Sequence, residues 1–143
     1  MAALLRFIFV MTMFFCAATS ASAADLKQSL QHYFSGSAIQ FGYGGGTSSN
    51  NPRVELTIHY CRSGLYYSSG QSCRPNLIAS GYQCTPMQDA GRWHLVVQSG
   101  QAMMQWRSNS SGLGSLPIFV SANGAVVDQR GNPFYRVGAA QCR

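Results

Sequence analysis

The chain has 143 residues, ten basic and four acidic side chains, and a formal net charge of +6. Its length fits one domain, and nothing after Asp25 is long and apolar enough to cross a membrane as a helix. The arginines stand singly rather than in runs, which is typical of solubility charge, so we expect no nucleic-acid partner.

The first 24 residues have the pattern of a cleaved secretory signal. Arg6 is the only charge before Asp25, an apolar run follows from Phe7 to Ala18, and small residues fill 19–24. This order of charge, short apolar core and small residues indicates an export signal cut after Ala23 or Ala24. We therefore expect a mature protein that is secreted or periplasmic, with nine basic residues and four acids.

Residues 25–52 are predicted to form a short helix and a linker. Leu26, Leu30, Tyr33 and Phe34 fall on one helical stripe, and Asp25 suits the first turn. The stripe is expected to pack on the domain. A short strand over 39–43 precedes a run of Gly, Ser and Asn up to Pro52 that has linker composition.

Residues 53–143 are predicted to form a β-domain. Apolar residues alternate from Val54 to Tyr60, the clearest strand signal in the chain, and Asn123-Gly124 is a strong hairpin signal. The fold class is mostly β: an antiparallel meander forming a small barrel or sandwich. Further strands are expected at 65–67, 77–82, 93–97, 102–107, 117–120, 125–127 and 134–137, with loops at 68–72, 74–76 and 109–114.

Four cysteines remain after the signal: Cys61, Cys73, Cys84 and Cys142. An even number in an exported chain predicts two disulfides, and three pairings are possible. We favour Cys73–Cys84, which closes a short loop, with Cys61–Cys142. The spacings contain no Cys-x-x-Cys pair, so no metal site and no cofactor are expected.

The stretch Gly91-Arg92-Trp93, opening a strand in a meander, resembles the Gly-x-Trp of the calycin barrels. Over about Val54 to Val137 the chain is similar to small secreted bacterial lipocalin-like domains. The resemblance implies a barrel in which the tryptophan closes one end. In lipocalins the motif lies in the first strand, whereas here strands precede it, so no ligand residue is carried over.

The sequence contains no nucleophile elbow, no Ser-x-x-Lys and no His-Glu-x-x-His, so no catalytic residue is assigned. We expect an exported, non-enzymatic binding or accessory domain, whose ligand is a small molecule, a glycan or a protein. Two alternatives stay open: a small hydrolase using His59, His94 and Glu55, and a structural envelope component. Aromatic and basic side chains suited to ligand binding are Tyr66, Trp93, Trp106 and Arg107.

Overall fold

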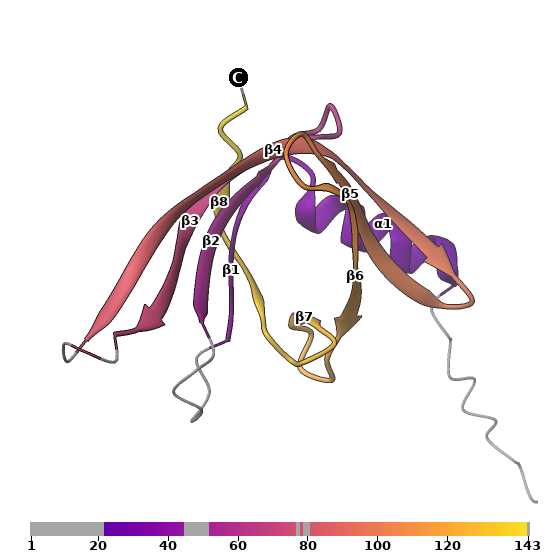
Figure 1. Cartoon of the computed structure of the whole chain (residues 1–143). Helices are drawn as coiled ribbons and strands as arrows, with labels where there is room; N and C mark the ends of the chain where they lie inside the picture. The colour runs from indigo at the N-terminus through magenta and orange to yellow at the C-terminus, as the bar shows by residue number, and fades with distance from the viewer. Residues whose placement is uncertain (1–21, 45–51, 77, 79–80, 143) are drawn as a thin grey trace, which may run out of the picture.

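The computed structural model describes residues 22–44, 52–76, 78 and 81–142. Within these ranges the chain forms one helix and a single eight-stranded antiparallel sheet (Figure 1). The predicted signal segment up to residue 21 and the linker residues 45–51 lie outside the described residues.

Helix α1 (Ala23–Phe34) confirms the predicted amphipathic helix. Its first turn is closed by a capping box: the Ser22 hydroxyl accepts from the Asp25 amide at 3.2 Å, and the Asp25 carboxylate accepts from the Ser22 amide at 3.1 Å. Ser22 and the first two residues of α1 belong to the segment predicted to be cleaved. Further along the helix, Leu30 and Phe34 are buried.

The strands follow one another as a meander. Their bounds are β1 (Ser37–Tyr43), β2 (Arg53–Tyr60), β3 (Leu65–Pro75), β4 (Tyr82–Gln98), β5 (Gln101–Ser108), β6 (Gly112–Val120), β7 (Val126–Asp128) and β8 (Phe134–Ala139). Their order in the sheet is β7-β6-β5-β4-β3-β2-β1-β8. The last strand therefore returns beside the first, and β1 belongs to the same sheet as the strands after Pro52.

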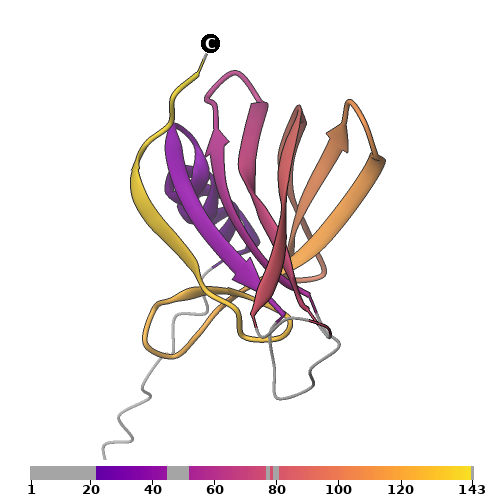
Figure 2. The ribbon, with the colours of Figure 1, turned by 60° about the vertical axis from the view of Figure 1, so that its left-hand side comes forward.

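The sheet forms a nearly closed barrel rather than a sandwich. The two outer strands, β7 and β8, follow each other in the chain, and a single bridge joins Val127 of β7 to Pro133, the residue before β8. Figure 2 shows the strands curling around α1. The predicted antiparallel meander with one N-terminal helix is confirmed, and of the two architectures left open the structure adopts the barrel.

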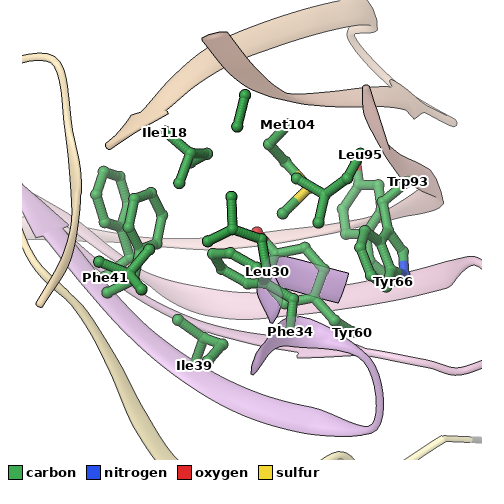
Figure 3. Packing of buried hydrophobic residues seen from close by; sticks show 13 residues of the cluster. Leu30, Phe34, Ile39, Phe41, Tyr60, Tyr66, Trp93, Leu95, Met104 and Ile118 are labelled. Atoms are coloured by element: carbon green, nitrogen blue, oxygen red, sulfur yellow. The ribbon is translucent and has the colours of Figure 1, made fainter. Parts of the chain in front are cut away.

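The core lies on the concave side of the sheet and includes the helix. Phe34 is fully buried and meets Tyr60 and Phe134 edge-on, with ring centroids 5.2 and 5.6 Å apart. Leu30 joins Ile39, Leu95, Met104 and Ile118 in the same cluster (Figure 3). These side chains come from the helix and from strands β1, β4, β5 and β6. Their contacts fix α1 inside the curved sheet.

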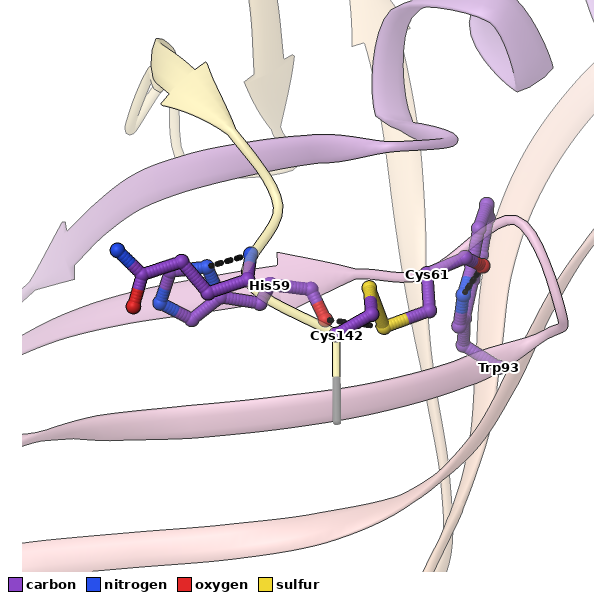
Figure 4. Close-up of a disulfide and its surroundings, with 5 residues drawn as sticks. His59, Cys61, Trp93 and Cys142 are labelled. Atoms are coloured by element: carbon purple, nitrogen blue, oxygen red, sulfur yellow. Dashed lines mark hydrogen bonds between the residues drawn. A yellow bond between two sulfur atoms is a disulfide. The ribbon is translucent and has the colours of Figure 1, made fainter.

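Both favoured disulfides form. Cys61 joins Cys142 across 81 positions of sequence, and Cys73 joins Cys84, its direct cross-strand partner in β3 and β4. Next to the first bridge, the Trp93 indole donates to the Cys61 carbonyl at 3.2 Å, and the Gln141 amide donates to His59 Nδ1 at 3.1 Å (Figure 4). The C-terminal segment is thereby fixed to the end of β2.

Several strands are longer than the sequence predicts. Residues 68–72 and 74–75, expected as loop, belong to β3, and 112–114 belong to β6. Strand β4 begins at Tyr82 and includes Pro86, which a strand interior disfavours. Residues 82–90 pair with β3 alone, since β5 pairs only from Gly91 onward. Pro86 therefore lies on a free edge, where its missing N–H removes no ladder bond.

Candidate ligand-binding cavity

A cavity of about 380 Å³ lies on the inner side of the barrel, within the volume range of small-molecule sites. Its walls come from all eight strands and from the β7–β8 turn. The lining residues are Phe41, Tyr43, Leu56, Ile58, Tyr60, Tyr66, Ser68, Asp89, Met104, Trp106, Leu116, Asp128, Gln129, Arg130 and Phe134.

The cavity begins where the packed core ends. Phe41, Tyr60, Tyr66, Met104 and Phe134 belong to the buried core and also line the cavity. Leu30 and Phe34 of α1 are in the core but not in the lining, so the helix fills only part of the barrel interior. The remaining space has mainly aromatic and aliphatic walls, which suit an apolar ligand.

Asp89 places a carboxylate at one wall of this apolar space. It accepts from the hydroxyls of Tyr66 at 2.5 Å, Ser108 at 2.7 Å and Ser110 at 3.0 Å. The Ser108 hydroxyl in turn accepts from the backbone amides of Ser110 and Ser111. One acidic side chain of β4 therefore connects β3, the end of β5 and the β5–β6 turn.

These hydrogen bonds determine the charge state of the cluster. Burial alone raises the pKa of Asp89, but the bonds from Ser108, Tyr66 and Ser110 outweigh it and hold that pKa below its usual value. Burial and the neighbouring Asp89 charge raise the pKa of Tyr66, whose hydroxyl stays a donor. The cavity wall thus carries a fixed negative charge at neutral pH.

The second carboxylate of the lining, Asp128, shapes the β7–β8 turn. It is 5% exposed and accepts from the amides of Arg130 and Asn132 and from the Asn132 side chain, each at 2.8 Å. These bonds form an Asx-type turn. The turn places Gln129 and Arg130 at the cavity, where they add polar groups to the apolar lining.

The four residues predicted for ligand binding do not share one site. Tyr66 and Trp106 line the cavity. Trp93 is 4% exposed and packs against Tyr60 in the core, with ring centroids 5.0 Å apart. Arg107 is exposed and lines a separate hollow on the outside of the barrel, which Trp106 also borders.

The residues of the hydrolase alternative lie on the outer face and are not brought together. Strands β2 and β4 flank β3 and do not pair with each other. His59 pairs with Tyr67 of β3, and Tyr67 pairs with Ala90 of β4. His94 lies four residues beyond Ala90 along β4, which offsets it from His59 by about 13 Å in the strand direction. Glu55 pairs with Arg53 instead. No group of three potential metal ligands occurs within the described ranges.

Sequence reasoning did not select Asp89 or the aliphatic lining. The usable signal was strand phase, because Asp89 is in step with buried Gly91, Trp93 and Leu95 and so faces inward. Likewise Leu56 and Ile58 share the phase of Val54 and Tyr60. Once the barrel is known, this alternation alone identifies most of the wall.

Comparisons with family models, with curated proteins and with solved structures found no match to this chain. In the part of the chain that the structure describes, no helix is long and apolar enough to span a membrane. Both disulfides are compatible with an oxidising, extracellular environment. The similarity to lipocalin-like domains stays a prediction from the residues that carry it.

Proposed function

We propose that the protein is an exported binding protein that holds a small, mainly apolar molecule inside its barrel. The supporting observation is the cavity of about 380 Å³, with aromatic and aliphatic walls and a few polar groups in fixed positions. Such a combination is typical of small-molecule sites. The disulfides that fix β3 to β4 and the C-terminus to β2 keep the barrel shape rigid, which reduces the cost of binding.

The polar groups suggest the ligand's chemistry. Asp89 presents a negative charge that its three hydroxyl donors do not neutralise, and no basic residue within the described ranges forms an ion pair with it. A ligand with an apolar body and an amine or hydroxyl head would place its donor at Asp89 and its body between Leu56, Met104 and Trp106. The binding energy would come mainly from the buried apolar area.

The test uses N-phenyl-1-naphthylamine, an apolar amine whose fluorescence rises in apolar surroundings. We expect saturable binding of one molecule per chain. Leu56→Trp places an indole in the cavity and is expected to weaken binding at least tenfold. Thr57→Trp makes the same kind of change at the neighbouring, outward-facing position and should leave binding unchanged.

Circular dichroism establishes that both variants are folded. If Leu56→Trp does not fold, Ser68→Leu offers a smaller change on the cavity wall. Probe binding that Thr57→Trp weakens as much as Leu56→Trp does would contradict binding in the barrel. A failure of the wild type to enhance the probe's fluorescence would contradict it as well.

A further inference from the structure

A second hollow lies on the outer face of β4, β5 and β6. Its volume is about 680 Å³, and most of its lining residues are polar or basic, whereas most of those of the inner cavity are apolar. Arg92 and His94 come from β4, and Gln105 and Arg107 from β5; Leu113, Ser115, Trp106 and Gly114 complete it. It therefore lies on the opposite face of the sheet from the cavity of the proposed function, and Trp106 is the one lining residue that the two share.

Two arginines occupy directly opposite positions in this hollow. Arg92 and Arg107 are cross-strand partners, and His94 is paired with Gln105 two residues further along the ladder, on the same face. Partners in an antiparallel pair have Cα atoms about 4.5–5.5 Å apart, and like charges placed so destabilise a sheet. An anion between the two guanidinium groups would remove that repulsion.

None of the acidic side chains is available to do this. The sequence has four acidic side chains, and each is engaged elsewhere. Asp25 caps α1, Glu55 pairs with Arg53, Asp89 accepts three hydroxyls, and Asp128 holds the β7–β8 turn. Among the residues that the structure describes, the ion pair of Arg53 with Glu55 is the only one.

We infer that this hollow binds the phosphate or sulfate group of a small organic ester. Two guanidinium groups supply paired N–H donors that match a tetrahedral oxyanion, as in many phosphate sites. The hollow is far larger than one oxyanion. Its remaining wall offers Gln105 and Ser115 as hydrogen-bonding groups and Leu113, 77% exposed, as an apolar contact for the organic part.

The experiment is isothermal titration calorimetry at low salt with four probes: glucose 6-phosphate, glucose 6-sulfate, inorganic phosphate and glucose. We expect one of the two esters to bind at one site, more tightly than inorganic phosphate, while glucose does not bind. Arg92→Gln and Arg107→Gln should each weaken ester binding at least tenfold. Arg136→Gln, an exposed arginine on β8, is the matched control and should change it less than twofold.

Three results would overturn the inference. Equal weakening by Arg136→Gln would indicate a diffuse charge effect. Equal affinity for inorganic phosphate and the esters would exclude an ester site. Absence of binding by both esters would exclude the oxyanion site itself. Binding of N-phenyl-1-naphthylamine in the same variants reports on the inner cavity, so failure of the outer site is distinguishable from failure of the proposed function.

Discussion

Asp89 has two functions at the scale of the single residue: it charges the cavity wall and it holds the β5–β6 turn through Ser108 and Ser110. Replacing it by asparagine, Asp89→Asn, removes the charge from three hydrogen bonds. We expect this change to lower the free energy of unfolding by about 1–2 kcal/mol, because hydrogen bonds to a charged group contribute about 1.5–3 kcal/mol and solvent screening reduces that value at a partly exposed side chain. Urea denaturation at pH 7 measures it.

The same substitution has a pH signature. The pKa of Asp89 is lowered in the folded state, so its contribution is present above the unfolded value of about 3.9 and is lost as the pH falls through the folded value. The stability difference between wild type and Asp89→Asn should therefore shrink below about pH 4. Glu55→Gln, whose carboxylate meets only exposed Arg53, is the control. A difference that stays constant from pH 7 to pH 2 would contradict the assigned charge state.

At the scale of elements, α1 is part of the barrel core rather than an appendage. Phe34 has no exposed surface and touches rings from β2 and β8. Truncation of such a buried phenylalanine to alanine costs about 3–5 kcal/mol. We predict that loss for Phe34→Ala and almost none for His32→Ala, an exposed position of the same helix. Denaturant titration measures the free energy of unfolding of both variants. Equally small losses in the two variants would mean that the helix is not docked.

The helix and β2 were predictable because the apolar residues of each recur on one side. In α1 the apolar residues form a stripe from Leu26 to Phe34, and in β2 they alternate with polar residues from Val54 to Tyr60. The distal half of β3 and the first half of β4 were not predictable. Residues 68–72 are Ser, Gly and Gln, and they are held in strands by the ladder and the Cys73–Cys84 bridge rather than by burial.

Gly114 illustrates the same limit in β6. The composition of residues 109–114 predicts a loop, yet Gly114 is the strand partner of Trp106. A Cβ at this position would lie 2.3 Å from two carbons of the Trp106 ring. Only glycine leaves room for the indole, so the choice depends on a neighbour from another strand, which local patterns do not report.

At the scale of the whole molecule, the bridge between Cys61 and Cys142 restrains the longest loop in the described chain, 81 positions. Restraint of the unfolded chain grows with loop length, and removal of a native disulfide typically costs about 2–5 kcal/mol. We predict a loss in that range for the double variant Cys61→Ser/Cys142→Ser. Thermal unfolding measures it.

The matched control is Cys73→Ser/Cys84→Ser, which opens a loop of only 11 positions between strands that are already paired. We expect this second variant to lose less stability than the first. The reverse order would show that the C-terminal segment contributes little to the folded state.

The site was less predictable than the fold. Four side chains were selected from the sequence for ligand binding, and the structure separates them among core, cavity and outer surface. The sequence gives the aromatic or basic character of each residue directly. The position of a cavity depends instead on how far the side chains of α1 and of the strands fill the barrel interior. Strand phase narrows the choice only after the barrel and its inner face are known.

The barrel interior is the proposed binding site, and methyl-selective NMR of the protein titrated with N-phenyl-1-naphthylamine tests its occupancy most directly. The cavity places methyl groups of Leu56, Ile58, Met104 and Leu116 on its wall, whereas Leu113 lies on the outer face. We predict that the four wall residues shift and show contacts to the probe while Leu113 does not. Shifts confined to Leu113 and other exposed methyls, or none at all, would contradict it.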